Sequence, residues 1–377
     1  FEGNKYFIKL HYGVGWKEIF KNLIKLRVPT LGAFPEWKAL KKLKSLGIDC
    51  PEPVCFYSKG INPSNIRSFL ITKSLINTIS LEEALQKGKF QELDFPSKKR
   101  FIEKVALISQ NLHNNGINHR DYYLCHFHVD SNMDVEKEIY LIDLHRAQLR
   151  TFVPTRWASK DIGGLFHSAM GFKLNERDFY RFIKTYFNCS LKEALETHSK
   201  FIRTSRDRAF RMFMKPILRE INISFTETQK DNSGYLGRKE DSLRWIAKKK
   251  YLSKGLEEII SQIDTYMEKG EIIKDEEGHK IIRINLNEDV FVIKKYQIKG
   301  SWHYLRKLFS QTRAFVAWKA SHWFNVSGIR TINIVAVIER YNFLSTKESY
   351  LISLNQPEER LDKVDLNKQQ GYLIENR

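Results

Sequence analysis

The alternation of apolar and polar positions divides roughly the first 220 residues into a strand-rich part followed by a helix-rich part. "NKYFIKLHYG" (4–13) and "RSFLITKSL" (67–75) are short aromatic and aliphatic runs typical of buried strands. Between them, "PEWKALKKLKSLGI" (35–48) places apolar residues at helical spacing and closes on a glycine. "KKRFIEKVALISQNLHNNGI" (98–117) predicts a longer amphipathic helix, and helical periodicity continues from "DFYRFIKTYF" to about Ile221. The pattern therefore predicts an α+β fold.

The C-terminal part repeats the pattern of the strand-rich part. "EWKALKKLKSLGI" is echoed by "AWKASHWFNVSGI", so that Trp37 and Trp318 lie 281 positions apart, as do Gly47 and Gly328. "SFLIT" and "SYLIS" keep the same offset of 281. A polar stretch, "TETQKDNSGYLGRKED" (226–241), has the composition of a linker between the two copies. A third segment, "YFIKLHYG", corresponds to "VFVIKKYQIKG" with a small gap. Because these three segments match in the same order, the sequence predicts a degenerate tandem repeat.

Composition narrows the possible partners. The formal net charge is +19, which favours an anionic partner such as a phosphorylated substrate, an anionic membrane surface or nucleic acid, although a lysine-rich soluble surface would give the same number. The four cysteines are too few and too scattered for a disulfide framework. No apolar run approaches the roughly 18–20 residues that a membrane span requires. We therefore expect reduced thiols and a chain that does not cross a membrane.

The stretch "GINHRDYYLCHFHVD" (116–130) concentrates reactive side chains. His119, Cys125, His126 and His128 are residue types that bind zinc, but no HxxxH or CxxC spacing is present. Cys125 and His126 are neighbours in sequence, which rarely places a thiol and its base face to face. Both of these interpretations are weak.

A phosphoryl-transfer site explains this stretch better, because its parts follow in order along the chain. That reaction needs a carboxylate near the acceptor hydroxyl, which Asp121 can supply, and an ion-binding carboxylate at a strand end, which Asp143 in "IYLIDLHR" can supply. It also needs a cation on the phosphates and an anion to position that cation. Lys9 in "YFIKL" and Glu36 at the start of the next helix fit these two roles. The alternative is that Lys9 and Glu36 form a surface pair and Asp143 ends a strand.

These motifs resemble a known family. "GINHRDYYLCHF" and "LIDLHRAQ", with "KLHYGVGWKEIFKNLIKLRVPTLGAFPEWKALKKL" and "RWASKDIGGLFHSA", are similar to the lipopolysaccharide core heptose kinases, the Kdo/heptose kinase group of the protein-kinase-like superfamily. The resemblance covers most of residues 1–220 and implies a bilobal kinase-like fold that uses ATP and Mg²⁺. The family's first strand and glycine loop would precede Phe1, so we expect either a fragment or a weakened grip on ATP.

The resemblance also implies roles for individual residues. Lys9 would hold the ATP phosphates and pair with Glu36, Asp121 would be the catalytic base, and Asp143 would bind Mg²⁺. His126 stands where typical protein kinases have a metal-binding asparagine, and would be a second Mg²⁺ ligand. The remaining side chains have lesser expected roles: Asp161 would anchor the catalytic loop from below, His119 and Arg120 would be structural, and Cys125 and His128 would be incidental.

The expected domains follow from the repeat and the resemblance together: a kinase-like domain over 1–224, a linker over 225–244, and an incomplete second kinase-like N-terminal lobe over 245–377. In this second copy Lys294 would match the strand lysine Lys9, and Ala317 stands at the position of Glu36. Gly278 would be all that remains of a glycine loop. No HRD motif or later metal-binding aspartate follows it, so we expect the copy to be inactive. A basic α+β appendage is the alternative.

The expected function is phosphorylation of a heptose in the lipopolysaccharide inner core. The resemblance implies a lipid A-core glycolipid as acceptor, a cytoplasmic location at the inner-membrane surface and acyl carrier protein as a further partner, with no nucleic acid expected. Two alternatives are a protein or small-molecule kinase of the same fold, and a non-enzymatic basic protein that binds membranes or nucleic acid. The charge alone suggests the last of these.

Overall fold

The computed structural model divides the chain into two compact units, Phe1–Phe213 (unit 1) and Met214–Arg377 (unit 2). It describes residues 5–24, 29, 31–172, 174–226, 234–240, 242–276, 278–297, 311–326, 329, 331–341 and 346–355. The division falls inside a helix, somewhat earlier than the boundary at residue 224 that the sequence predicts. Within the described residues, no helix has the length and apolar character needed to span a membrane.

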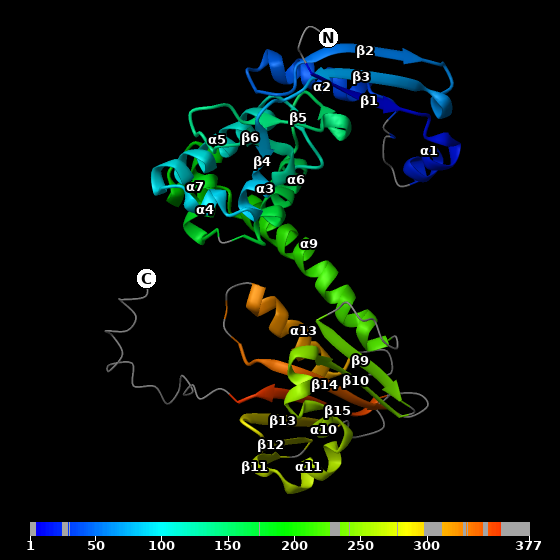
Figure 1. Ribbon diagram of the computed structural model, residues 1–377, viewed down its shortest axis with the longest axis vertical. Coiled ribbons are helices and arrows are strands. Elements are labelled where there is room, and N and C mark those ends of the chain that lie inside the picture. Colours follow the sequence, from blue (N-terminus) through cyan, green and yellow to red (C-terminus); the bar gives the residue numbers. More distant parts are fainter. Residues whose placement is uncertain are drawn as a thin grey trace. The chain divides into compact units, whose positions relative to one another are not determined.

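Unit 1 begins with a three-stranded antiparallel sheet and two helices (Figure 1). The strands at 4–13 and 67–75 and the helix at 35–48 were predicted, whereas the strand Pro53–Lys59 and the helix Gly15–Ile24 were not. The elements are β1 (Tyr6–His11), α1 (Gly15–Ile24), α2 (Phe34–Ser45), β2 (Pro53–Lys59) and β3 (Arg67–Lys73). The strands are ordered β1-β3-β2, and the register sets Lys9 opposite Leu70. Lys9 therefore lies in the middle of β1, and the pairing of β1 with β3 fixes its position.

Helix α2 forms where the apolar spacing predicts it. A proline stands in its first turn, where the missing N–H is not needed, and acidic Glu36 lies near the positive end of the helix dipole. Ala39, Leu40 and Leu43 are buried on one face. The chain leaves the helix through Gly47, whose φ of +68° is one that glycine adopts without strain. Burial of this face fixes the direction in which Glu36 points.

The rest of unit 1 is mainly helical. Its elements are β4 (Thr78–Ser80), α3 (Leu81–Gln86), α4 (Lys89–Glu92), α5 (Phe95–Asn114), β5 (Ile117–Asn118), β6 (Phe127–Asp130), β7 (Tyr140–Leu141), β8 (Gln148–Leu149), α6 (Thr155–Ala169), α7 (Glu176–Phe187), α8 (Leu191–Thr197) and the first half of α9 (Ser199–Thr226). Short 3₁₀ turns cover Leu124–His126 and Leu144–Arg146. The two short sheets β4-β6-β7 and β5-β8 bracket the histidine-rich stretch.

One hydrophobic core joins the sheet-bearing part of unit 1 to its helical part. Leu43 of α2 and Leu70 of β3 belong to the same buried cluster as Phe101 and Leu112 of α5. Phe127 of β6 and Leu141 of β7 are also in this cluster and are fully buried. The strands and turns that carry the candidate site are thus held by a continuous apolar core.

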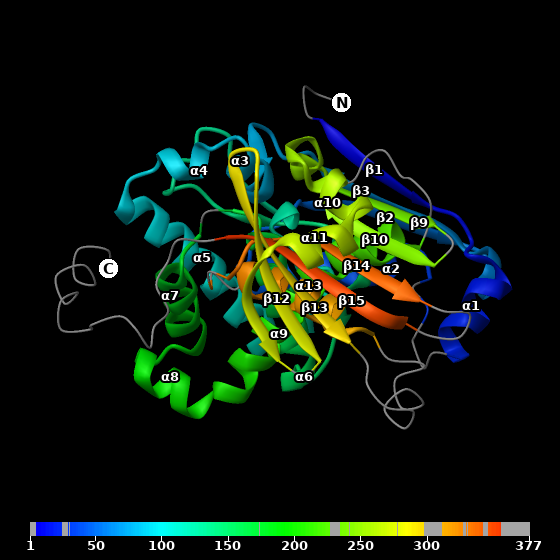
Figure 2. The ribbon, with the colours of Figure 1, turned by 90° about the horizontal axis from the view of Figure 1, so that it is seen from below.

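Unit 2 contains a seven-stranded antiparallel sheet in the order β11-β12-β13-β15-β14-β10-β9 (Figure 2). Its elements are β9 (Tyr235–Glu240), β10 (Leu243–Lys248), α10 (Leu256–Ser261), α11 (Ile263–Lys269), β11 (Glu271–Glu276), β12 (His279–Leu286), β13 (Asp289–Gln297), α13 (Arg313–Val326), β14 (Ile334–Tyr341) and β15 (Thr346–Leu354). A 3₁₀ segment covers Lys249–Lys254.

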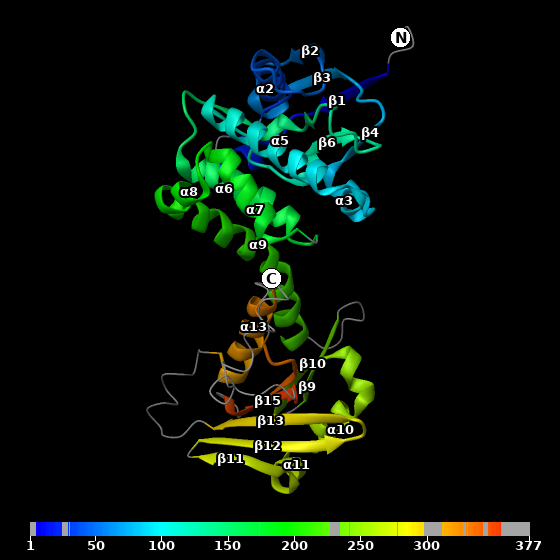
Figure 3. The same ribbon diagram turned by 90° about the vertical axis from the view of Figure 1, so that its left-hand side faces the viewer.

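Helices cover both faces of this sheet. Residues of α10 and α11, such as Ile259 and Met267, pack in one core with Phe291 and Ile293 of β13. Phe315 and Trp318 of α13 pack in a second core with Val337 and Leu351, on strands β14 and β15 (Figure 3). The sheet of unit 2 is therefore the middle layer of three.

The linker predicted over 225–244 is wrong for much of its length. Tyr235–Glu240 and Leu243–Lys248 form the hairpin β9–β10, and β10 pairs with β14. The interior strand β10 is buried at Trp245, Ile246 and Ala247, which lie just beyond the predicted linker. The edge strand β9 has few apolar positions, so composition alone cannot distinguish it from a linker.

Candidate active site

The loop that carries Asp121 is anchored from below by Asp161 of helix α6. The Asp161 carboxylate accepts the backbone N–H of His119 at 2.7 Å and that of Arg120 at 3.0 Å. Asp161 is almost fully buried, and its Oδ2 also lies 3.4 Å from Nε2 of His113. Arg120 has a φ of +74°, a left-handed conformation that is unfavourable for a non-glycine residue. The carboxylate stabilises this conformation, in agreement with the anchoring role expected for Asp161.

Replacing Asp161 with alanine should destabilise the protein and distort the loop. Two buried backbone N–H groups would lose their acceptor, and each such group costs about 1–3 kcal/mol. We therefore expect the free energy of unfolding of Asp161→Ala to fall by roughly 3 kcal/mol in total in chemical denaturation. Asp207→Ala, which removes an exposed carboxylate from α9, is the matched control and should change stability by less than about 0.5 kcal/mol. Equal stability of the two variants would contradict the anchoring role.

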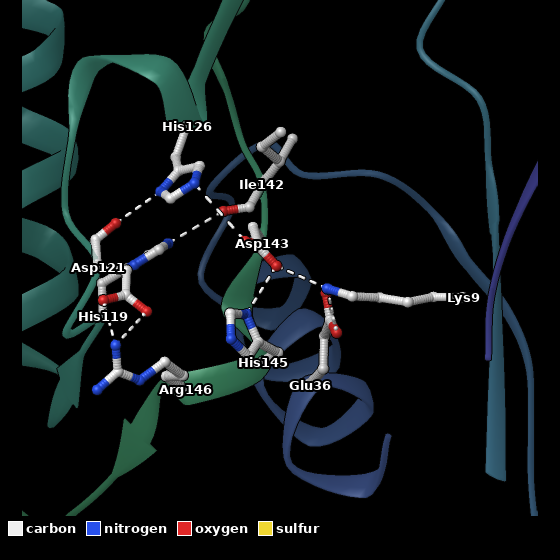
Figure 4. Close-up of polar contacts among 9 residues, drawn as sticks. All are labelled: Lys9, Glu36, His119, Asp121, His126, Ile142, Asp143, His145 and Arg146. Carbon is white, nitrogen blue, oxygen red and sulfur yellow. Dashed lines mark hydrogen bonds and ion pairs between the residues drawn. The ribbon is translucent and has the colours of Figure 1, made fainter. Parts of the chain in front are cut away.

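Asp121 is held by an arginine that sequence reasoning did not assign. Nη1 of Arg146 donates to Oδ1 of Asp121 at 2.6 Å and to Oδ2 at 2.9 Å (Figure 4). The Asp121 side chain is largely shielded from solvent, whereas Arg146 remains partly exposed. Such a charge-assisted contact fixes the orientation of the carboxylate. The only sequence signal for Arg146 is its place in "LIDLHRAQ", three positions after Asp143.

Asp143 lies just beyond β7, at the start of a 3₁₀ turn. Its φ of +59° is again left-handed, which turns the side chain away from the strand direction. Oδ1 accepts hydrogen bonds from Nδ1 of His145 at 2.8 Å and from Nζ of Lys9 at 2.6 Å. The hydrogen bond from His145 lowers the pKa of Asp143 far below its ordinary value, burial opposes this, and the bond and charge of Lys9 add to it. Asp143 is therefore a carboxylate at any physiological pH.

Lys9 bridges the two carboxylates predicted to accompany it. Its Nζ lies 3.0 Å from Oε2 of Glu36 and 2.6 Å from Oδ1 of Asp143. Burial lowers the pKa of Lys9, but the charge of Glu36 and the hydrogen bond and charge of Asp143 outweigh it, so the net shift is upward. Glu36 is 5 % exposed, and this burial raises its pKa despite the opposing charge of Lys9. Lys9 is thus a fixed positive charge beside Asp143.

His126 presents one ring nitrogen to Asp143. Its Nδ1 is 2.6 Å from the backbone carbonyl oxygen of Asp121, which can only accept, so Nδ1 carries the proton (Figure 4). In the neutral ring the lone pair of Nε2 is then available, and Nε2 lies 3.6 Å from Oδ2 of Asp143. His119 stacks on His126 and donates from its own Nε2 to the carbonyl oxygen of Ile142 at 3.0 Å. His119 therefore supports the ring that faces Asp143.

The structure brings Lys9, Glu36, Asp121, His126 and Asp143 into one polar cluster, drawn in Figure 4. Sequence reasoning missed His145, which bonds Asp143, and Arg146, which bonds Asp121. The remaining reactive side chains of the stretch are outside the cluster. Burial raises the pKa of Cys125 to about 11, which leaves the thiol protonated, and His128 contacts Thr78 of β4.

The sequence of unit 1 is similar to known proteins over most of its length. Residues 1–186 match the model of the lipopolysaccharide kinase (Kdo/WaaP) family. A lipopolysaccharide core heptose(I) kinase WaaP of Escherichia coli is 42 % identical over 222 residues, which cover 58 % of this chain and 84 % of the relative. The WaaP of Pseudomonas aeruginosa is 36 % identical over 215 residues, covering 56 % of this chain and 80 % of the relative.

A solved structure titled "WaaP in complex with acyl carrier protein" is also similar. It is 30 % identical, with a TM-score of 0.47, and the match covers 56 % of this chain and 82 % of that one. The sequence relatives and the family match support the α+β, kinase-like fold predicted for the first domain. The chain is a kinase, and it belongs to the lipopolysaccharide kinase (Kdo/WaaP) family.

Proposed function

We propose that unit 1 transfers the γ-phosphoryl group of ATP to a hydroxyl of a heptose in the lipopolysaccharide inner core. The observation that carries this proposal is the polar cluster, in which a base candidate, a fixed cation and an ion-binding carboxylate converge. The acceptor comes from the relatives, which are named heptose(I) kinases and are matched over 80–84 % of their length.

Asp121 is the proposed catalytic base. Phosphoryl transfer requires a carboxylate that orients the acceptor hydroxyl and accepts its proton. Arg146 orients this carboxylate through Nη1. The side chain of Arg146 is itself partly exposed, which leaves room for the acceptor to approach.

Lys9 is the proposed ligand of the ATP phosphates, positioned by Glu36. A lysine already held by a buried glutamate presents its charge in one place, which reduces the reorganisation needed when the nucleotide binds. The contact between Lys9 and Asp143 keeps the phosphate-binding cation beside the metal-binding carboxylate. These two residues would bind neighbouring parts of the same nucleotide complex.

The donor set at Asp143 fits Mg²⁺. The residues that the structure describes contain no group of three or more His, Cys, Asp or Glu side chains arranged to hold a metal by themselves. Magnesium does not require one, since it usually takes one or two protein ligands and completes its shell with phosphate oxygens and water. The Asp143 carboxylate and the free lone pair of His126 Nε2 would provide those ligands. Bound Mg²⁺ neutralises the charge that develops on the phosphoryl oxygens.

The proposed location is the cytoplasmic face of the inner membrane. A glycolipid acceptor lies in a bilayer, and the net charge of +19 favours contact with an anionic surface. The partner expected from the family resemblance, acyl carrier protein, stays a prediction.

The acceptor is tested by offering purified acceptors in parallel. With ATP and Mg²⁺, the protein should phosphorylate heptose-containing core lipopolysaccharide and leave generic protein substrates unmodified. Incorporation of labelled phosphate into each acceptor is the measurement, and core material truncated before the heptose is the matched control. Preferential labelling of the protein substrates would instead support a protein kinase of the same fold.

We also propose that unit 2 contains a second, inactive copy of the strand-rich lobe of unit 1. In unit 1 the elements β1, α2, β2 and β3 follow one another, with α1 inserted after β1, and the strands form the sheet order β1-β3-β2. In unit 2 the elements β13, α13, β14 and β15 follow in the corresponding order, and the strands form the sheet order β13-β15-β14. The pairing also agrees, since Lys9 lies opposite Leu70 and Lys294 lies opposite Leu351. Leu351 follows Leu70 by 281 positions and Lys294 follows Lys9 by 285, which is the small gap between these two strands in the sequence match.

The second copy would not bind a nucleotide in the manner of the first. Helix α13 (RAFVAWKASHWFNV) has no acidic residue that could pair with Lys294, which instead lies over the ring of Tyr296 at 5.1 Å. Trp318 is fully buried, and its counterpart Trp37 is partly buried. The helix therefore keeps its packing role in the second copy. Gly278 lies in the turn between β11 and β12 and has a positive φ. Gly328 lies outside the described residues.

A further inference from the structure

Unit 1 exposes large apolar side chains at one end of its sheet, around helix α1 (Figure 1). We call this surface the α1 surface; it consists of Tyr12, Val14, Trp16, Phe20, Leu23, Ile24 and Ile61. The exposed fractions are large, reaching 82 % at Ile24 and 100 % at Ile61. A contiguous exposed apolar surface of this kind marks an interaction site in a soluble protein.

Helix α1 is amphipathic with its more apolar face turned outward. Trp16, Phe20 and Leu23 follow the i, i+4, i+7 spacing of a single helix face, and the rings of Trp16 and Phe20 are 5.7 Å apart. Its one buried side chain is Ile19, which packs inward. Within unit 1, Ile19 is therefore buried, whereas Trp16 and Phe20 remain exposed to solvent.

The sheet register places Ile61 at the same end as α1. His11, the last residue of β1, lies opposite Ser68, and Lys59, the last residue of β2, lies opposite Arg67. The turn that contains Ile61 therefore emerges where β1 leads into α1. The link is close-packed, because a Cβ on Gly13 would lie only 2.1 Å from the carbonyl oxygen of Ser64. The helix and the turn thus form one surface.

Basic side chains surround this surface. Lys17, Lys21, Lys59 and Arg67 are exposed at the same end of the sheet. The stretches 12–24 and 57–67 contain one acidic residue, Glu18, which accepts a hydrogen bond from Lys21 at 3.0 Å. The charge around the apolar residues is therefore positive.

We propose that the α1 surface docks onto an anionic lipid bilayer, with Trp16, Phe20 and Ile61 entering the interfacial zone and the surrounding lysines contacting lipid phosphates. Helices that lie in a bilayer interface combine Trp, Phe and Leu on one face with Lys or Arg beside it. Aromatic side chains favour the boundary between hydrocarbon and head groups, and cations near an anionic surface add favourable electrostatic energy. A lipid surface therefore satisfies the apolar and the cationic parts at once.

The test uses the full chain and vesicles that contain no lipopolysaccharide, so it does not depend on the proposed acceptor. The protein should co-sediment with phosphatidylglycerol–phosphatidylethanolamine vesicles far more than with phosphatidylcholine vesicles. The double variant Trp16→Glu/Phe20→Glu should lose at least about tenfold in apparent affinity, because both side chains would carry charge into the interface. The matched control, Leu107→Glu/Leu195→Glu, changes two exposed helical residues elsewhere in unit 1 and should bind as the unaltered protein does.

A second variant separates folding from docking. Lys17→Glu/Lys21→Glu keeps the apolar residues and should weaken binding to anionic vesicles, with a shallower dependence on salt. Phosphorylation of a water-soluble acceptor fragment should be the same for all variants, because none alters the polar cluster. Vesicle binding by Trp16→Glu/Phe20→Glu that equals that of the control variant would overturn the proposal. An absence of vesicle binding by the unaltered protein would also overturn it, and loss of a protein partner in Trp16→Glu/Phe20→Glu would then identify the surface as a protein-docking site.

Discussion

Replacing Asp121 with asparagine should reduce the rate of phosphoryl transfer to the acceptor by about 10²–10⁴-fold, the usual contribution of a positioned general base. Asparagine keeps the size of the side chain but cannot take the proton of the acceptor hydroxyl. It also loses the charge that Nη1 of Arg146 contacts at 2.6 and 2.9 Å. Binding of ATP should be little changed, because Lys9 and Asp143 are intact. Steady-state kinetics with saturating ATP, together with nucleotide titration, measure the two effects separately.

A matched control for this variant lies in the same unit. Asp134 is exposed and its Oδ1 accepts a local backbone N–H from Glu136, a contact that asparagine can also make. Asp134→Asn should retain the full rate, so a loss confined to Asp121→Asn is specific to the site. A normal rate in Asp121→Asn, with the variant folded, would remove Asp121 from catalysis and leave Arg146 as a structural partner only.

The second large effect is expected at Lys9, and Lys294 provides the internal comparison. Lys9→Met should lower kcat with ATP by about 10²–10³-fold, the usual result of removing one preorganised electrostatic contact to the reacting group. Lys294→Met should stay within about twofold of the unaltered protein, because α13 offers no carboxylate to position that lysine. The two lysines occupy equivalent strand positions, opposite Leu70 and Leu351. Comparing the two variants therefore shows whether activity depends on the carboxylates around Lys9 and not on a lysine at this strand position.

Thermal unfolding of both variants completes this comparison. Removal of Lys9 leaves Glu36 and Asp143 without the cation that bridges them, so some loss of stability is expected there and should be measured beside the kinetics. The activity loss must exceed any loss of folded protein. Comparable inactivation by Lys294→Met would mean that unit 2 contributes to nucleotide binding, and would contradict the proposal that the second copy is inactive.

Local patterns were sufficient to predict most elements of unit 1. The stripe of Leu40 and Leu43 predicted α2, and the apolar runs around Lys9 and Leu70 predicted β1 and β3. These signals succeed because helix and strand periodicities are imposed by burial of one face. The expectation that Lys9 and Glu36 should meet came from the requirements of phosphoryl transfer and from the family resemblance.

Side-chain contacts made by the turns of the site could not be predicted from the hydrophobic pattern of the sequence. Arg146 meets Asp121 across 25 positions, and His145 meets Asp143 only because Asp143 adopts a left-handed conformation. Neither conformation nor pairing leaves a periodic trace in the sequence. The hairpin β9–β10 was missed for a different reason: the edge strand β9 (YLGRKE) has few apolar positions, and they lie close to Lys and Arg residues.

The central claim is that unit 1 transfers phosphate from ATP to a heptose hydroxyl, and the most direct measurement locates that phosphate on the product. Purified core lipopolysaccharide lacking the heptose phosphate would be incubated with the full chain, ATP and Mg²⁺, and the isolated core examined by ³¹P–¹H correlation spectroscopy. The account predicts one new phosphomonoester coupled to a heptose proton, formed by the unaltered protein and absent with Asp121→Asn. Phosphate found on another sugar, or ATP consumed with release of inorganic phosphate alone, would contradict it.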